Sequence, residues 1–203
     1  MANNINLSTV NIIKNPIEID GLVAVNSQDV DAIFDIRYAS NNNICNTKLY
    51  SSPFFYLNYE CLQMLKKAIS VAKRIGLKIK IFDGYRPIAV QKYMFDKFIN
   101  NSGFVSNPDG GVVSHCRGVA IDLTLTNIDG IELDMGSDFD EFSNISYHNS
   151  ELISSDALKN RLLLLGLMSS CGFDFYQKEW WHYQLFKPRD YPIIIGDACL
   201  SAF

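Results

Sequence analysis

The segment SHCRGVAIDLTL, residues 114–125, sets a histidine and an aspartate seven positions apart around a glycine, ahead of a run that alternates like a β-strand. Alternation gives the strand an apolar side expected to face the core, formed by Val119, Ile121, Leu123 and Leu125. Asp122 then lies on the opposite side. Gly118 lets the chain turn tightly enough to bring the ring of His115 back toward that carboxylate. The pattern predicts two metal-binding side chains, although such an isolated pair is more often a surface histidine near a surface aspartate.

The composition limits the classes of protein to which this chain can belong. The 203 residues suit one domain, 1–203, in which the asparagine-rich residues 1–34 form an irregular N-terminal wrap. Hydrophobic residues make up 48% and charged residues 20%, which is typical of a globular protein and too apolar for a disordered one. The net charge of -4 argues against a nucleic-acid partner or an anionic membrane surface. The longest apolar run, 162–168, is too short to cross a bilayer.

The cysteines and the first residues indicate a compartment. The five cysteines are an odd number without paired spacing, which favours a reducing environment: Cys45, Cys61, Cys116, Cys171 and Cys199. The start of the chain lacks the basic residues and apolar core of a secretory signal. We therefore expect a cytoplasmic protein. The oligomeric state stays open, a homo-oligomer included.

Periodicity and breaker residues predict the regular elements. Helices are expected from the cap at Asn58 to the stop at Gly76, over 88–99, and from the caps at 154–156 to Cys171. Strands are expected at 77–82, 118–125, 131–135, 172–176 and 180–186. The turn 127–130 should join two of them as a hairpin. This order predicts an α+β fold with a central antiparallel sheet flanked by helices.

The segment EWWHY, residues 179–183, places Glu179 three positions before His182. In a straight strand these side chains point to opposite faces, so both reach one site only if the chain turns or bulges at the tryptophans. With that turn, His115, Asp122 and His182 would give zinc three ligands and leave a position for water. Glu179 would then be the general base of a hydrolysis. The alternative is a buried histidine bonded to the backbone beside an exposed glutamate.

Arg86 in DGYRP, residues 83–87, is a further candidate. The following proline biases it away from helical geometry, so its guanidinium is expected on an extended segment at a strand end. There it would stabilise an oxyanion on a cleaved carbonyl. The alternative is a structural ion pair between Asp83 and Arg86.

Six segments together resemble the zinc-dependent D-alanyl-D-alanine dipeptidases of the vancomycin-resistance type, in peptidase family M15. They are DIRYAS (35–40), DGYRP (83–87), SHCRGVAIDLTL (114–125), MGSDFD (135–140), CGFDFY (171–176) and EWWHY (179–183). The resemblance implies a DD-peptidase/hedgehog-like fold, one Zn²⁺ per chain, and hydrolysis of the D-alanyl-D-alanine dipeptide to two D-alanines. It implies three zinc ligands, His115, Asp122 and His182, with Glu179 as the base and Arg86 stabilising the transition state.

The resemblance also implies contacts with the dipeptide. Asp140 would meet the substrate's ammonium group, while Ser114 and Tyr38 would hold the ends of the dipeptide. Cys116 stands where the family carries serine; its thiolate could compete for the metal, or the residue is a small filler. His148 is interpreted as a loop histidine.

Two other functions remain open on the sequence. One is a zinc carboxypeptidase that acts on the longer stem peptides of peptidoglycan. The other is a non-catalytic, zinc-stabilised binding module, which would keep the three metal ligands. Such a module has no need of Glu179 or Arg86, so their presence favours an enzyme.

Overall fold

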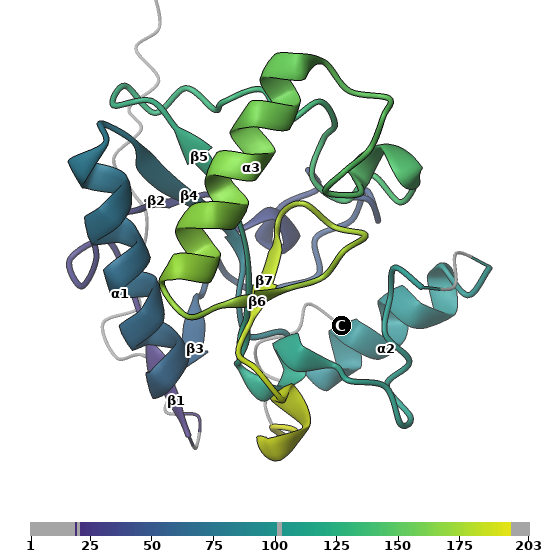
Figure 1. Cartoon of the computed structure of the whole chain (residues 1–203). Coiled ribbons are helices and arrows are strands. Elements are labelled where there is room, and N and C mark those ends of the chain that lie inside the picture. Colours follow the sequence, from purple (N-terminus) through teal and green to yellow (C-terminus); the bar gives the residue numbers. More distant parts are fainter. Residues whose placement is uncertain (1–18, 20, 101–102, 196–203) are drawn as a thin grey trace, which may run out of the picture.

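The computed structural model describes residues 19, 21–100 and 103–195 (Figure 1). The helices in this part of the chain are α1 (Tyr59–Arg74), α2 (Ile88–Lys97) and α3 (Ser155–Ser170). The strands are β1 (Leu22–Ala24), β2 (Ile33–Phe34), β3 (Tyr56–Asn58), β4 (Lys78–Asp83), β5 (Ala120–Thr126), β6 (Asp174–Phe175) and β7 (His182–Gln184). Short 3-10 helices are η1 (Arg37–Ala39), η2 (Ser114–Arg117), η3 (Asn144–Ser146) and η4 (Pro188–Asp190).

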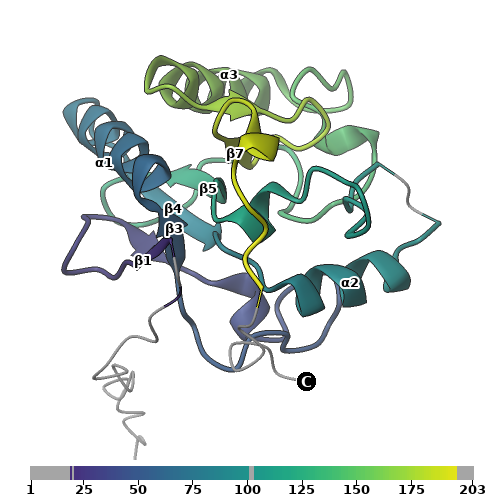
Figure 2. The same ribbon diagram turned by 90° about the horizontal axis from the view of Figure 1, so that it is seen from below.

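A five-stranded sheet with the order β2-β4-β5-β7-β6 lies between helices. α1 and α3 contact each other on one face of this sheet, and α2 lies on the other side (Figure 2). β2 runs parallel to β4, and the other pairings are antiparallel. The predicted α+β fold, with a largely antiparallel sheet flanked by helices, is therefore confirmed. The parallel edge strand was not predicted.

β5 is the middle strand, and all seven of its residues are buried. Its predicted core side is confirmed, because Ile121, Leu123 and Leu125 belong to the hydrophobic core cluster. Alternation did not predict that the opposite side is buried as well. Asp122 on that side is only 2% exposed and lines a cavity.

The long helices begin and end where the sequence predicts. The side chain of Asn58 caps the start of α1, and that of Ser154 caps the start of α3. Gly76 and Gly172 follow the two helices at φ of 75° and 105°, in the left-handed region that ends a helix. No helix in the described ranges is long and apolar enough to cross a membrane.

The predicted hairpin forms only beside its turn. Glu132 bridges Thr126, and the N–H of Leu133 donates to the carbonyl of Leu125 at 2.9 Å, but residues 131–135, all of them described, form no strand. The turn at 127–130 is present. The hairpin does not extend further, because the same edge of β5 is paired with β7 and with Trp181 from Leu123 back to Ala120.

The described part of the predicted irregular wrap over 1–34 contains two short strands. β1 pairs with β3, and β2 forms an edge of the main sheet. Each of these strands spans at most three residues, too short to show alternation in the sequence. Residues 1–18 and 20 lie outside the described ranges. The strands predicted at 172–176 and 180–186 are also shorter than expected, and they correspond to β6 and β7.

A β-bulge turns the end of β4 toward the cavity. Ile81 pairs with Leu123 and Asp83 pairs with Asp122, so Phe82 is an extra residue on the β4 side. Bulges of this kind bend a strand and redirect its side chains. The segment DGYRP therefore leaves the sheet beside Asp122.

A substitution at Gly118 tests the tight link between η2 and β5. It has φ of 67°, and an added Cβ would lie 2.2 Å from Cδ2 of Leu22. We expect Gly118→Ala to lower the free energy of unfolding by about 1–3 kcal/mol, because alanine is strained at this φ and must displace the leucine. Chemical denaturation measures the change.

The matched control is Gly166→Ala in α3. An added Cβ at Gly166 meets no atom within 4 Å. We expect this change to raise the free energy of unfolding by about 0.5–1 kcal/mol, because alanine favours the helix. Equal changes in both variants would contradict the role given to Gly118.

Candidate active site

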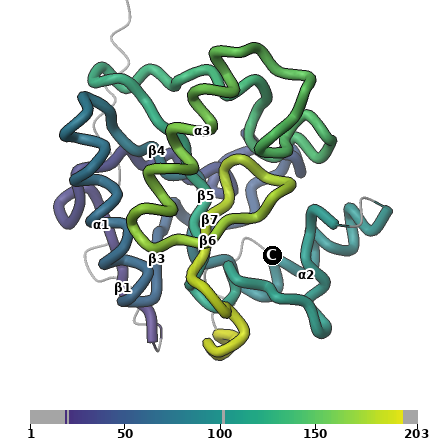
Figure 3. The backbone as a smooth tube through the Cα atoms, in the orientation of Figure 1, coloured from purple at the N-terminus to yellow at the C-terminus, as the bar shows by residue number. Residues whose placement is uncertain are grey.

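Three side chains from separate elements converge: His115 from η2, Asp122 from β5 and His182 from β7. Asp122 and His182 are cross-strand partners in β5 and β7, which lie side by side (Figure 3). Nδ1 of His182 and Nε2 of His115 lie 3.2 and 3.3 Å from Oδ1 of Asp122. One ligand atom of each residue lies within 4.8 Å of the other two, and all three residues are buried. Two imidazoles and a carboxylate at this spacing suit a zinc ion.

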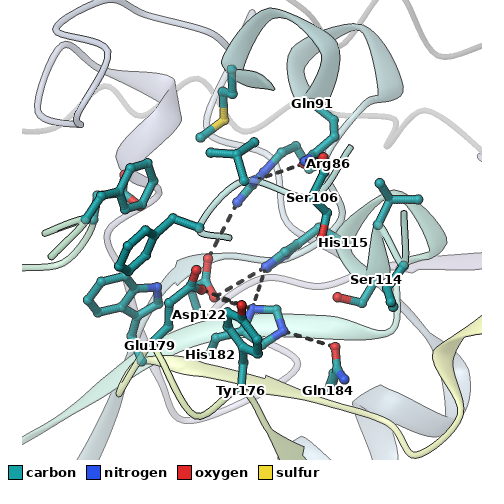
Figure 4. Close-up of a pocket in the computed structure, with 18 of the residues that line it drawn as sticks. Arg86, Gln91, Ser106, Ser114, His115, Asp122, Tyr176, Glu179, His182 and Gln184 are labelled. Carbon is teal, nitrogen blue, oxygen red and sulfur yellow. Dashed lines mark hydrogen bonds and ion pairs between the residues drawn. The ribbon is translucent and has the colours of Figure 1, made fainter. Parts of the chain in front are cut away.

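Hydrogen bonds on the outer side of each ring orient the two histidines. Nδ1 of His115 lies 2.7 Å from the carbonyl oxygen of Gly84, and Nε2 of His182 lies 3.2 Å from Oε1 of Gln184 (Figure 4). These oxygens only accept, so each outer nitrogen donates, and a neutral ring held in this way would present its inner nitrogen to a cation. The inner nitrogens are 3.1 Å apart. Both inner nitrogens also lie close to Oδ1 of Asp122, so the three donor atoms could bind one cation.

The acid of this cluster is ionised at neutral pH. Burial opposes the charge of Asp122, but His115 and His182 outweigh burial and hold the pKa of this carboxyl below its ordinary value. Asp122 is therefore ready to act as a ligand.

Glu179 reaches the cluster because the chain turns before β7. The N–H of His182 donates to the carbonyl of Glu179 at 3.2 Å, which closes a turn through Trp180 and Trp181. Oε2 of Glu179 thereby lies 3.9 Å from Nδ1 of His182, so the geometric condition set by the sequence is met. Burial raises the pKa of Glu179 to about 8, although His182 lowers it. A cation in the cluster would favour the ionised form.

Arg86 faces the cluster from the opposite side of the cavity (Figure 4). Its Nε and Nη2 donate to Oδ2 of Asp83 at 3.0 and 2.8 Å, so the structural pair considered from the sequence is present. Nη1 donates to Oε1 of Gln91 at 3.1 Å. These bonds use three of the five guanidinium N–H groups. Nη2 also lies 3.6 Å from Oδ2 of Asp122, which directs the remaining donors toward the site.

The cluster opens into a cavity of about 260 Å³. Its walls include the three residues that the resemblance assigned to the substrate: Tyr38, Ser114 and Asp140. The hydroxyl of Tyr38 donates to Oδ2 of Asp140 at 2.9 Å. Burial raises the pKa of Asp140 to about 7, although Arg86 lowers it. Pockets for drug-sized ligands measure roughly 300–1,000 Å³, so this one suits a smaller molecule.

Comparison with known proteins assigns the family. The profile of peptidase family M15, described as D-ala-D-ala dipeptidase, matches residues 18–192, a span that contains the whole site. The chain belongs to this dipeptidase family. The D-alanyl-D-alanine dipeptidase of Escherichia coli (strain K12) is 34% identical over 164 residues, 81% of this chain and 84% of the relative. That of Enterococcus faecium is 35% identical over 178 residues, 78% of this chain and 88% of the relative. The resemblance found in the sequence is confirmed.

One solved structure is similar to this dipeptidase family member at lower identity. The LdcB LD-carboxypeptidase is 21% identical, with a TM-score of 0.49, over 85% of this chain and 71% of that chain. This likeness is too low to bear on the substrate.

The dipeptidase site contains polar residues that the sequence did not single out. Gln184 orients His182, and it follows that ligand by two positions, so strand periodicity alone would have placed both on one face. Gln91 accepts from Arg86, while its Nε2 donates to the carbonyl of Ser106 at 2.7 Å. No local signal identifies Gln91, because its role depends on how a distant loop packs against α2.

Cys116 and His148 are both buried. Burial raises the pKa of Cys116 to about 12, so it carries a neutral thiol rather than a competing thiolate. His148 lies between η3 and α3, and its ring packs against Phe175 and Tyr183. Neither ring nitrogen of His148 has a hydrogen-bond partner within the described ranges. Burial, aided by the charge of Arg161, lowers its pKa to about 4.

A substitution at Gln184 tests whether this residue orients the ring of His182 for metal binding. We expect Gln184→Met to raise the dissociation constant for Zn²⁺ by about 10–100-fold, the usual effect of losing a hydrogen bond that orients a ligand. Gln184→Glu keeps an acceptor and should bind Zn²⁺ close to the wild-type affinity. Competition with a chromophoric chelator measures both. Wild-type affinity in the methionine variant would exclude this role for Gln184.

His148 provides a test by pH. Its folded pKa lies below the ordinary value near 6.5, so the unfolded chain binds more protons between pH 6.5 and 4, and stability falls as pH falls through this window. Between pH 7 and 4, we expect the unfolding free energy of the wild type to fall by about 2–3 kcal/mol more than that of His148→Phe. Urea denaturation at each pH measures it. Parallel pH profiles of wild type and variant would contradict the buried neutral state.

Proposed function

We propose that this chain is a zinc-dependent D-alanyl-D-alanine dipeptidase, which hydrolyses the free dipeptide to two D-alanines with one Zn²⁺ per chain. The observation that carries the proposal is the convergence of a metal-binding cluster, a buried glutamate and a second buried carboxylate around one small cavity. Family membership supports the reaction class, and the curated relatives bear the name of this activity.

The cleavage step assigns roles to the cluster and to Glu179. Zinc held by His115, Asp122 and His182 would polarise the peptide carbonyl and lower the pKa of water at an open ligand position from 15.7 to about 7. Glu179 accepts a proton as the water oxygen attacks the carbonyl carbon. It returns this proton to the nitrogen of the leaving D-alanine as the C–N bond breaks. One water is consumed and two amino acids are released.

Arg86 stabilises the negative charge that develops on the carbonyl oxygen. Asp83 and Gln91 already hold its guanidinium in place, so little reorganisation accompanies the reaction. Removing one preorganised donor of this kind typically costs roughly 2.7–4 kcal/mol in the transition state.

The buried carboxylate of Asp140 selects for a free dipeptide. An ammonium group there would pair with Asp140 and favour its ionised form, while Tyr38 orients the carboxylate. Ser114 would hold the other end of the dipeptide. A stem peptide presents an amide at the ammonium position, so it would leave the carboxylate unpaired and extend beyond a cavity of about 260 Å³.

We place this reaction in the cytoplasm. The four cysteines within the described ranges are free thiols, which fits a reducing compartment: Cys45, Cys61, Cys116 and Cys171.

Turnover by the zinc-loaded protein tests the function. We expect it to release D-alanine from D-alanyl-D-alanine with a higher kcat/KM than from a stem pentapeptide that ends in the same two residues. Glu179→Gln should retain zinc and lose at least ~100-fold in kcat, because it removes the base. His182→Ala should instead lose zinc, because it removes a ligand. Zinc content is measured by elemental analysis.

Each outcome separates the candidate functions. Preferential cleavage of the pentapeptide would establish the carboxypeptidase. Zinc binding without hydrolysis of either substrate would establish the binding module. A Glu179→Gln variant as active as the wild type would remove the glutamate from the mechanism.

A further inference from the structure

Arg161 in α3 is buried, with 1% of its surface exposed. Its guanidinium donates to three carbonyl oxygens of the segment that precedes the helix. Nε donates to Met135 at 2.6 Å, and Nη1 donates to Ile145 at 2.9 Å and to Tyr147 at 2.6 Å. One side chain therefore holds both ends of the segment 135–147.

Ser137 connects this segment to the turn before β7. Its hydroxyl oxygen accepts from Nη2 of Arg161 at 3.1 Å and from the indole N–H of Trp180 at 3.0 Å. The guanidinium carbon also lies 5.8 Å from the centroid of the Trp180 ring. The backbone N–H of Trp180 donates to the carbonyl of Ser146 at 3.1 Å, at the other end of the same segment.

These contacts join the two carboxylates that flank the cavity. Asp140 lies three residues after Ser137, and Glu179 immediately precedes Trp180. Asp140 has φ of 64°, a conformation that residues other than glycine rarely adopt, so surrounding contacts must hold it there. Arg161 is not among the described residues that line the cavity, and it acts through its neighbours.

The chemistry of the contacts favours a geometric role for this arginine. Its acceptors within the described ranges are neutral oxygens: three carbonyls and one hydroxyl. Burying a cation without a carboxylate partner is costly, and an apolar side chain would fill the same volume. Unlike an apolar side chain, a guanidinium group holds several hydrogen-bond acceptors at set directions in one plane.

We propose that Arg161 is a positioning residue that sets the spacing between Asp140 and Glu179, and thereby makes the site select substrates with the length and free ammonium group of a dipeptide. The inference rests on the proposed function. A shift of the segment 135–147 would move the partner of the ammonium group relative to the base. Misplacement by about 1 Å can cost roughly 100-fold in rate.

The test measures selectivity for the ammonium group in the zinc-loaded full chain. N-acetyl-D-alanyl-D-alanine, which lacks that group, is added as a competitive inhibitor of D-alanyl-D-alanine hydrolysis. Selectivity is defined as the inhibition constant of the acetylated dipeptide divided by the KM of the free dipeptide. This ratio does not depend on how much of the enzyme is folded. We expect Arg161→Lys and Ser137→Ala to lower it at least ~5-fold and to lower kcat, with zinc content unchanged. Ser137→Ala leaves the bonds of Arg161 to the three carbonyls intact, so it provides the test if Arg161→Lys does not fold.

The matched control is Leu65→Ala, which opens a cavity in the fully buried side of α1 away from both segments. It should lower the thermal midpoint and leave the selectivity unchanged. The inference is overturned if folded, zinc-loaded Ser137→Ala keeps the selectivity within ~2-fold of wild type, or if Leu65→Ala lowers it equally. A wild-type chain that does not hydrolyse D-alanyl-D-alanine would instead overturn the proposed function itself, and the inference with it.

Discussion

The cross-strand pair of Asp122 and His182 is the contact on which the site depends. It places a carboxylate and an imidazole face to face in the middle of the sheet, and the η2 segment adds the ring of His115. The outer nitrogens of both rings are bonded to fixed acceptors, so the inner nitrogens stay directed at the carboxylate. A bound cation would be coordinated by all three side chains. Metal binding and folding would therefore be coupled at this position.

Around this pair, each charged group is held by buried neighbours rather than by solvent. Arg86 is fixed by Asp83, and Asp83 accepts a further bond from Tyr50 at 2.5 Å. Asp140 is fixed by Tyr38, whose ring lies 4.9 Å from the guanidinium carbon of Arg86. Such networks are rigid when every member is satisfied and costly when one is missing. The cavity is thus shaped before any ligand enters, which is the condition for preorganised catalysis.

The sequence predicted the elements whose signals are local. α1 and α3 carry their own caps at Asn58 and Ser154, and the spacing in EWWHY showed that Glu179 reaches the site only if the chain turns there. The predicted hairpin is short because β7, which lies far away in the chain, pairs with the rest of that edge of β5. Arg161 gave no signal, because its role comes from acceptors in a loop that periodicity does not describe. What escaped prediction was set by long-range packing.

The matched positions of Asp122 and His182 in β5 and β7 also limit how such a chain can change in length. Neighbouring residues in a strand face opposite sides, so Ile121 and Tyr183 point to the core while the two ligands point to the cavity. Deleting one residue from either strand would exchange these sides and bury the catalytic groups among hydrocarbon. Connections between the elements are free of this parity rule, although the segment 135–147 is held by its contacts with Arg161. Insertions and deletions should therefore accumulate in the connections and be excluded from two short strands.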